Sequence, residues 1–332
     1  MNIEDKKDFF VVNNISKWYL QRKSTRHILD RAGNQWVKAV DGISFSLGEG
    51  EILGVIGESG CGKSTLGRIL VRLEDPTSGD IHINGVPASA ILKNDPKKFR
   101  RTVQIVFQNP FDTFSPRHTI GETLVRTLKL HDIGNNEEEQ YAMCKAALAN
   151  ASLSPPEDYL SRYPYELSGG QLQRISILKA MLLEPPFIVA DEPVSMLDVS
   201  VRADIINMLQ ELSRKNNSSM VFISHDIATT RYISNRVMVM YLGRVVEMGY
   251  TDEVVQAPRH PYTRALISNC ASIDPNEIKQ PIAISGEPPT PVNAGPGCYF
   301  APRCYAAGAE CFKSYPAVQD IGGGHFISCH NI

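Results

Sequence analysis

The sequence predicts an α/β fold with a mostly parallel sheet, and three of its features carry that prediction. An apolar run, EILGVI, precedes the glycine-rich GESGCGKST of residues 57–65, and an apolar stripe at helical spacing follows it. Two further apolar runs, FIVADEP and SMVFISHD, end in polar residues, as buried strands of a parallel sheet do. Ligands collect at the carboxyl ends of such strands, so we expect these three ends to converge on one site.

The first strand, its loop and its helix form a phosphate-binding motif. GESGCGKS fits G-x-x-x-x-G-K-[ST] without a gap. Small residues let backbone N–H groups curve round a polyphosphate, Lys63 adds a charge, and Ser64 offers a hydroxyl to Mg²⁺. The following helix is predicted from four apolar residues at i, i+3, i+4 and i+7, namely Leu66, Ile69, Leu70 and Leu73. Triphosphate binding is therefore assigned to Gly57, Glu58, Ser59, Gly60, Cys61, Gly62, Lys63, Ser64 and Thr65.

The second and third strand ends supply acid–base chemistry. Asp191, at the end of FIVAD, is suited to hold Mg²⁺ through water. Glu192 points another way and is suited to orient or deprotonate the attacking water. His225 follows the third strand, and that position favours a contact with the γ-phosphate over a structural role.

A second anion-binding device lies in LSGGQ, residues 167–171. Ser168 and Gln171 form a capping box, and a helical face continues after them. Ser-Gly-Gly at a helix N-terminus presents free N–H groups to an anion, here from Ser168, Gly169 and Gly170. In one simple arrangement, these N–H groups contact a nucleotide that another subunit holds.

Three other segments complete the expected core. RVMVMYLGRVVEMG predicts two short strands that turn at Leu242 and Gly243. NNEEEQYAMCKAALANASL, residues 135–153, has a helical composition. A further helix after Asp198 is predicted from an apolar stripe at Val201, Ile205, Met208, Leu209 and Leu212.

Taken in order, these motifs resemble those of the ABC ATPase family over roughly residues 10 to 250. GESGCGKST resembles the Walker A motif, FIVADE the Walker B motif and LSGGQ the signature. Gln108 in VFQNP resembles the Q-loop, SMLD with Asp198 the D-loop, and His225 the switch histidine. The resemblance implies a P-loop ABC ATPase core with an N-terminal antiparallel β part and a helical subdomain at about 109–183.

The same resemblance implies a cofactor and a mechanism. ATP with Mg²⁺ would lie between the Walker A motif of one chain and the signature of another, in a head-to-tail dimer. Gln108 would sense Mg²⁺ and the γ-phosphate, while the helical subdomain touches membrane subunits. An N-terminal aromatic residue stacks on adenine in this family, and Tyr19 matches its place, with Trp18 or Trp36 as alternatives.

The C-terminal part resembles one branch of the family. HPYTRAL, GEPPTP and GCYFAPRC, between residues 260 and 304, resemble the extension of oligopeptide/dipeptide importer ATPases. We therefore expect an ATPase domain at 9–258 and an extension at 259–332. The branch implies peptide uptake at the cytoplasmic face of the membrane, with a second, different ATPase chain, two permease subunits and an extracytoplasmic solute-binding protein. One departure is Lys179, where the family has arginine, expected on an exposed helix face.

Two alternatives remain open at this point. The cargo could be a nickel chelate or an oligosaccharide, because the ATPase does not touch it. The chain could instead be a soluble ABC ATPase acting on nucleic acid or ribosomes, but a net charge of −2 and the lack of basic arms argue against nucleic acid. No apolar stretch approaches the roughly 20 residues that span a bilayer, and the N-terminus is not a secretory signal, so we expect a cytosolic chain.

Four of the seven cysteines lie in the last 35 residues. Their spacing is C-x5-C-x6-C-x17-C, at Cys298, Cys304, Cys311 and Cys329. The branch implies a [4Fe–4S] cluster here, with zinc or unligated thiols as alternatives. His325 and His330 could join a zinc site. Of the other three, Cys61 is expected to be a tolerated small residue of the glycine-rich loop, and Cys144 and Cys270 are expected to be packing residues.

Overall fold

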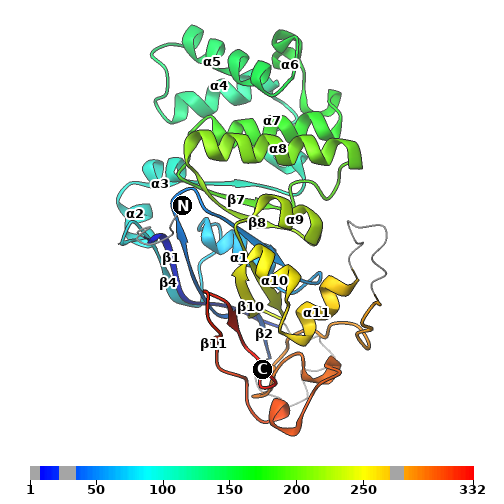
Figure 1. Ribbon diagram of the computed structural model, residues 1–332. Coiled ribbons are helices and arrows are strands. Elements are labelled where there is room, and N and C mark those ends of the chain that lie inside the picture. The colour runs from blue at the N-terminus through cyan, green and yellow to red at the C-terminus, as the bar shows by residue number, and fades with distance from the viewer. Residues whose placement is uncertain (1–7, 22–34, 270–279) are drawn as a thin grey trace, which may run out of the picture. The chain divides into compact units, whose positions relative to one another are not determined.

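The computed structural model describes residues 8–21, 35–269 and 280–332, and its internal contacts divide the chain into two compact units (Figure 1). We call the one that carries LSGGQ the signature unit; its described residues are Asp8, Gly48–Glu51 and Val86–Phe222. We call the other the P-loop unit; its described residues fall within Phe9–Leu47, Ile52–Gly85 and Ile223–Ile332. Each unit has its own core and its own part of the predicted machinery.

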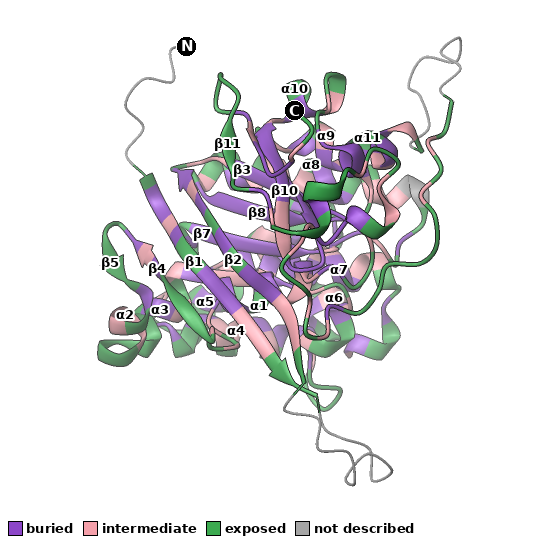
Figure 2. Ribbon diagram, turned by 90° about the horizontal axis from the view of Figure 1, so that it is seen from below, coloured by how far each residue is buried: buried purple, intermediate pink, exposed green. Residues whose placement is uncertain are grey.

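The P-loop unit contains an antiparallel sheet formed near the N-terminus. Strand β1 (Asp8–Leu20) lies between β2 (Trp36–Gly48) and β4 (Ser78–Ile83). β1 is antiparallel to β4, with Phe10 opposite Ile83. Figure 2 shows buried stretches along β1 and β2, which fits their apolar alternation. This is the N-terminal β part that the sequence predicted.

The second sheet of the P-loop unit carries the strand that leads into the glycine loop. β3 (Ile52–Ile56) is fully buried and parallel to β9 (Arg236–Tyr241). β9 turns into antiparallel β10 (Arg244–Tyr250) through Leu242 and Gly243, as predicted. Beyond β10 lie two short strands near the C-terminus, β12 (Phe326–Ile327) and β11 (Gln319–Asp320). The helical elements of this unit are α1 (Lys63–Leu70), α9 (Ile227–Ile233), α10 (Thr251–Gln256), α11 (Pro261–Ser268), η4 (Ala301–Arg303) and η5 (Ala309–Phe312).

The C-terminal segment completes the core of the P-loop unit. Ile56, at the end of β3, belongs to the same buried cluster as Tyr262, Tyr299 and Phe300. Tyr262 and Phe300 also pack against Tyr241 of β9, with ring centroids 4.8 and 5.2 Å from it. The extension is therefore part of the apolar interior next to the glycine loop, although it was recognised from sequence as a separate segment.

The signature unit combines three strands with most of the helices. β6 (Val103–Val106) pairs in parallel with β7 (Phe187–Asp191), and β8 (Ser219–Ile223) follows β7 in the sheet order. The other elements of this unit are β5 (Val86–Pro87), α2 (Ala88–Asn94), α3 (Pro96–Thr102), η2 (Pro110–Thr113), α4 (Ile120–Leu130), α5 (Glu137–Asn150), α6 (Pro156–Ser161), η3 (Pro164–Glu166), α7 (Gly169–Met181) and α8 (Val199–Asn216).

The helices of the signature unit bury their own apolar cluster. Leu124 and Leu128 of α4 pack with Cys144 and Leu148 of α5 and with Leu172 of α7. α7 and α8 lie alongside each other (Figure 1). Cys144 is fully buried there, so its predicted packing role is confirmed. The helical prediction for residues 135–153 is also confirmed over α5.

Three further observations concern the end of α1, the length of the helices and the predicted domain boundary. α1 ends at Leu70, so Leu73 lies outside the predicted helical stripe, and its side chain is exposed. Among the described residues, every helix is too short or too polar to cross a lipid bilayer. The proposed boundary between residues 258 and 259 remains a prediction, because the P-loop unit runs through it.

Candidate functional site

The glycine loop between β3 and α1 has a backbone that only glycine can adopt at two key points. Gly57 has a φ of 155°, and a Cβ there would lie 2.3 Å from the Met240 carbonyl oxygen. Gly62 has a φ of 103°, and its Cβ would lie 2.0 Å from the Ala39 carbonyl oxygen. The loop is therefore wedged between β2 and β9, which fixes its curvature.

Lys63 lies inside this loop. Its ammonium donates hydrogen bonds to the carbonyl oxygens of Gly57 at 2.7 Å and Glu58 at 3.0 Å. Only 5% of the residue is exposed, and Cys61 beside it is buried as well. Because Lys63 also begins α1, a cation and a helix N-terminus are presented at the same point, as a phosphate site requires. Burial raises the pKa of the Cys61 thiol.

His225 belongs to the P-loop unit and lies just after Ser224, whose backbone N–H donates to the Val55 carbonyl oxygen of β3 at 3.1 Å. That bond brings residue 225 close to the strand that feeds the loop. The His225 side chain is exposed, and Asp226 next to it caps α9 by accepting from the Ala228 N–H at 2.9 Å. The structure thus places the predicted switch histidine at a strand end, while its contact with phosphate stays a prediction.

The aromatic candidates for adenine stacking have different surroundings. The Tyr19 hydroxyl donates to the Glu74 carboxylate, and the ring is 37% exposed. Burial of the hydroxyl and the nearby Glu74 carboxylate raise the pKa of Tyr19 to about 12. The Trp18 indole N–H instead donates to Asp41 at 3.2 Å, and the Lys38 ammonium covers its ring. The Lys17 ammonium likewise lies 5.3 Å from the Tyr19 ring centroid, so these contacts do not separate the two candidates, and the role of Tyr19 stays a prediction.

In the signature unit, Gln108 and Glu192 lie in contact. The Gln108 amide donates to the Glu192 carboxylate at 3.1 Å and to the Ser195 hydroxyl at 3.1 Å. Glu192 has a φ of 45°, an unusual left-handed backbone that turns its side chain away from the strand direction of β7. Asp191, one residue earlier, is buried. Gln108, Glu192 and Ser195 of the SMLD segment therefore lie in contact, while the predicted roles of Asp191 and Asp198 stay predictions.

The signature motif begins α7 as predicted. The Ser168 hydroxyl accepts from the Gln171 N–H at 3.3 Å, and the Gln171 side chain accepts from the Ser168 N–H at 3.0 Å. This is the capping box read from the sequence. A Cβ on Gly170 would lie 2.9 Å from Val201 Cγ1 of α8, so the close approach of α8 requires glycine there. Asp198 is exposed at the N-terminus of α8.

One residue that the sequence reasoning missed connects these parts. Gln173, buried in α7, donates from its amide to the carbonyl oxygens of Pro193 at 2.9 Å and Phe107 at 3.3 Å. It therefore ties the signature helix to the residues beside Glu192 and Gln108. A glutamine among the buried apolar residues Leu172, Ile175 and Ile177 of this helix was the available signal.

The exposed position predicted for Lys179 is wrong. The loop around η2 covers this part of α7, and the Lys179 ammonium donates to the Thr113 carbonyl oxygen at 3.2 Å. The ammonium also lies 5.4 Å from the Phe114 ring centroid. Burial lowers the pKa of Lys179, as expected for an ammonium taken from water.

The four tail cysteines lie near one another without forming a recognisable metal site. The Cys298 N–H donates to the Cys311 carbonyl oxygen at 2.7 Å, and burial together with the thiols of Cys311 and Cys329 raises the pKa of Cys298. Across the described part of the chain, no set of three or more histidine, cysteine, aspartate or glutamate side chains is arranged to hold a metal ion.

The two tail histidines have other partners. His325 Nε2 lies 2.8 Å from the buried Glu247 carboxylate, and His330 Nε2 lies 2.9 Å from the Ser314 carbonyl oxygen. The Nε2 atom of each histidine therefore contacts an oxygen of the protein and not a cysteine. Cys270 lies outside the described residues.

Comparison with known proteins agrees with this arrangement. The ABC transporter family model matches residues 40–195, and the model described as "Oligopeptide/dipeptide transporter, C-terminal region" matches residues 246–311. The putative oligopeptide transport ATP-binding protein YkfD of Bacillus subtilis is 42% identical over 91% of this chain and 92% of its own. The dipeptide transport ATP-binding protein DppF of Escherichia coli is 43% identical over 90% of this chain and 88% of its own.

Among solved structures, the dimeric ATP-binding cassette MJ0796 with ADP and Pi superposes with a TM-score of 0.63 at 26% identity, covering 73% of this chain and 98% of that one. With relatives above 40% identity over nine-tenths of its length, the chain belongs to the ATP-binding proteins of ABC transporters. It falls in the group that carries the oligopeptide/dipeptide transporter C-terminal region. The predicted P-loop ABC ATPase fold and the family resemblance are thereby confirmed.

Proposed function

We propose that the chain is the ATP-hydrolysing subunit of an ABC importer that takes up di- or oligopeptides. One observation carries the proposal: relatives named for dipeptide and oligopeptide transport match it at 42–43% identity through both the ATPase part and the C-terminal region. The ATPase part alone would fit many transported solutes. The C-terminal region narrows the choice to this branch.

The residues divide the chemistry among them. Residues 57–65 cradle the phosphates, with Lys63 as the cation, and we assign Mg²⁺ binding to Ser64, Asp191 and Gln108. Mg²⁺, when bound with the nucleotide, neutralises charge on the phosphates. Glu192 takes the proton of the attacking water, and His225 steadies the γ-phosphate. Ser168, Gly169, Gly170 and Gln171 present the N-terminus of α7 to a nucleotide held by the partner ATPase, with Asp198 beside that interface.

Gln108 provides the coupling step of this proposal. Its amide holds the Glu192 carboxylate at 3.1 Å, so any displacement of the Q-loop alters the group that activates water. Contact of the helical subdomain with the permeases is then transmitted to hydrolysis through one hydrogen bond. Gln173 extends the link, because it binds the carbonyl oxygen of Phe107 directly before Gln108.

The partners follow from the branch. We propose a second, different ATPase chain, two membrane-spanning permeases and an extracytoplasmic solute-binding protein, with this chain bound peripherally at the cytoplasmic face. Co-purification from gently solubilised membranes tests this assembly, and identification of the permeases and the bound solute tests the cargo. Recovery with nickel-chelate or oligosaccharide permeases would contradict the peptide assignment. Recovery with ribosomes or nucleic acid and no membrane protein would contradict transport.

For the tail cysteines we propose a [4Fe–4S] cluster with a structural role, and zinc as the second occupant. The proposal rests on the C-x5-C-x6-C-x17-C spacing within this branch. The described side chains do not form a metal-holding group, so no step of transport is assigned to it. Iron, sulfide and zinc are quantified after anaerobic purification. Substoichiometric iron and sulfide contradict the cluster, and stoichiometric zinc in their place supports the alternative.

A further inference from the structure

The C-terminal extension reaches the glycine loop through one arginine. Arg303, in η4, forms two parallel hydrogen bonds with the carboxylate of Glu58, from Nη1 to Oε2 at 2.7 Å and from Nη2 to Oε1 at 3.0 Å. Glu58 is the second residue of the phosphate-binding motif and lies 245 residues earlier in the chain. Paired N–H donors that face both oxygens of a carboxylate form one of the strongest side-chain contacts in proteins.

Arg303 is itself held in place on its other sides. Its guanidinium also donates to the Tyr241 hydroxyl at 3.2 Å, the Ser285 carbonyl oxygen at 3.1 Å and the Gly286 carbonyl oxygen at 3.0 Å. Only 8% of the Arg303 side chain is exposed, so solvent screens this ion pair weakly. The planar fork of arginine satisfies these acceptors together, which the single ammonium of lysine cannot do.

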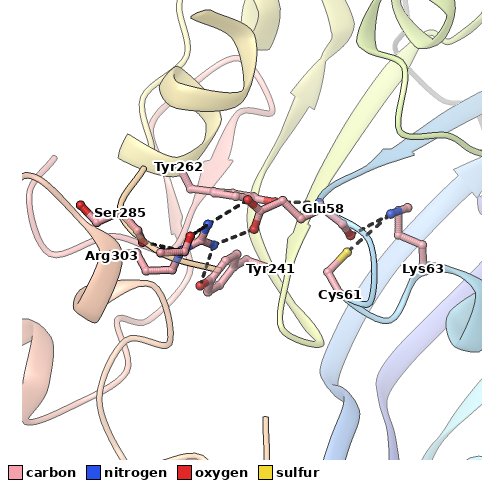
Figure 3. Close-up of polar contacts among 8 residues, drawn as sticks. Glu58, Cys61, Lys63, Tyr241, Tyr262, Ser285 and Arg303 are labelled. Atoms are coloured by element: carbon pink, nitrogen blue, oxygen red, sulfur yellow. Dashed lines mark hydrogen bonds and ion pairs between the residues drawn. The ribbon is translucent and has the colours of Figure 1, made fainter. Parts of the chain in front are cut away.

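A second contact fixes the backbone of the same residue. The Glu58 N–H donates to the hydroxyl of Tyr262, in α11, at 2.8 Å. Tyr262 is fully buried and packs at the edge of the Tyr241 ring. Figure 3 shows Arg303 and Tyr262 on one side of Glu58, with Cys61 and Lys63 on the other. Both the side chain and the amide of Glu58 are thus held by the extension.

Glu58 in turn contacts Lys63, the phosphate-binding lysine of the loop. The Glu58 carbonyl oxygen accepts from Lys63 at 3.0 Å, and the preceding Gly57 carbonyl oxygen accepts at 2.7 Å. Rotation of the Glu58 peptide would therefore move both acceptors that hold the Lys63 ammonium. We propose that Arg303 is a positioning residue for ATP: through Glu58 it sets the first turn of the loop and the place of Lys63, and so makes nucleotide affinity depend on the C-terminal extension.

This inference rests on the proposed role of residues 57–65 as the nucleotide cradle, and it differs from a merely structural role for Arg303. If Arg303 only held the extension in place, its loss would lower stability and leave ATP affinity alone. If it acts through Glu58, removing either partner has the same effect on affinity, and removing both adds nothing. A double-mutant cycle separates the two cases.

The experiment measures binding of a fluorescent ATP analogue, and KM and kcat for ATP, on the full chain. Arg303→Met and Glu58→Gln should each weaken binding about tenfold, and the double variant by about the same factor. The KM for ATP should rise, whereas kcat should stay within about twofold of the parent value, because Glu192 is unchanged. Arg303→Lys should recover part of the affinity. Lys313→Met, which removes an exposed positive charge that pairs with Glu310 in the same tail, is the matched control and should bind as the parent does.

The outcomes are distinct. Parent-like affinity in a folded Glu58→Gln variant, or losses that add in the double variant, would overturn the proposal. If Arg303→Met does not fold, Glu58→Gln still decides, because its partner remains in place. Lys63→Ala serves as the test of the cradle itself: parent-like binding there would refute the assignment of residues 57–65, whereas strong loss there with no effect at Glu58 would refute only the role of Arg303.

Discussion

The P-loop unit and the signature unit hold their functional residues in contrasting ways. In the signature unit the signature motif is supported locally, because Ser168 and Gln171 cap α7 three residues apart, whereas Glu192 is also bound by Gln108, 84 residues earlier. In the P-loop unit the glycine loop is held by partners 204 and 245 residues away, Tyr262 and Arg303. The signature can therefore form with its own helix, whereas the glycine loop depends on the folding of the C-terminal extension.

The largest expected effect tests the local cluster of the signature unit. Glu192→Gln keeps the shape of the side chain and removes the carboxylate proposed to take a proton from water. ATP hydrolysis should fall at least about 100-fold, because a positioned general base contributes that much or more. Nucleotide affinity should stay close to the parent, and the closed dimer should accumulate. Steady-state ATPase and equilibrium binding measure the two quantities.

Glu211→Gln is the control for this change, since Glu211 is an exposed carboxylate on α8 of the same unit. It should hydrolyse ATP at the parent rate. A Glu192→Gln variant with parent-like turnover would show that the contact with Gln108 has another purpose and that water is activated elsewhere.

The next effect tests the long-range support of the P-loop unit. Asp41 on β2 is 5% exposed and forms an ion pair with Arg244 at 2.7 Å and a hydrogen bond with the Tyr299 hydroxyl at 3.0 Å. Asp41→Asn should lower the free energy of unfolding by about 3 kcal/mol, because Arg244 then loses the buried negative charge that pairs with it. Urea unfolding measures this, and Glu310→Gln, in an exposed pair of the tail, should cost under about 0.5 kcal/mol.

The pH dependence of that loss has a definite sign. Burial works to raise the pKa of Asp41, but the hydrogen bond and charge of Arg244 prevail and lower it below its ordinary value of 3.8. A depressed carboxyl pKa adds stability that is present above the unfolded pKa and lost as pH falls through the folded one. The stability difference between parent and Asp41→Asn should thus stay constant from pH 7 down to about 4 and shrink below it. A difference that shrinks already near pH 6 would contradict this assignment.

Much of this molecule could be predicted from local sequence pattern. The glycine loop, the capping box of α7 and the turn at Leu242 and Gly243 each depend on residues within a few positions of one another, so spacing alone specifies them. The fold class followed for the same reason, because each buried strand was a short apolar run between polar ends.

The remainder depended on contacts that no short pattern encodes. Arg303 and Tyr262 lie in the motifs that resemble the oligopeptide/dipeptide importer extension, but the sequence around them does not indicate that Glu58 is their partner. Lys179 was expected on an exposed helix face, because the sequence of the helix does not show that the loop around η2 covers this position. The cysteine spacing suggested a metal, whereas ligand geometry depends on how the intervening loops fold.

A smaller effect is expected from removing the second contact of the extension with Glu58, the hydrogen bond from the Glu58 N–H to the Tyr262 hydroxyl. Tyr262→Phe keeps the ring and removes the hydroxyl that accepts the Glu58 N–H. Stability should fall by about 1–2 kcal/mol, the usual cost of leaving a buried donor without its partner. ATP affinity should weaken by a few-fold, less than for Arg303→Met, since the bidentate pair remains. Tyr305→Phe, at an exposed tyrosine of the same tail, should change neither quantity. Unchanged affinity in Tyr262→Phe would assign the positioning of Glu58 to Arg303 alone.

The smallest change asks whether the signature is as locally supported as its hydrogen bonds indicate. Ser168→Ala removes the cap of α7 and should lower the free energy of unfolding by about 1 kcal/mol. Hydrogen exchange should become faster at residues 169–171 and stay unchanged in the P-loop unit. Thr119→Ala removes an equivalent capping box from α4 and provides the matched control. It should lose a similar amount of stability and keep ATP turnover, whereas Ser168→Ala should lower turnover by the dimer. If exchange also accelerates in the glycine loop, the two units share their support, and the contrast between them does not hold.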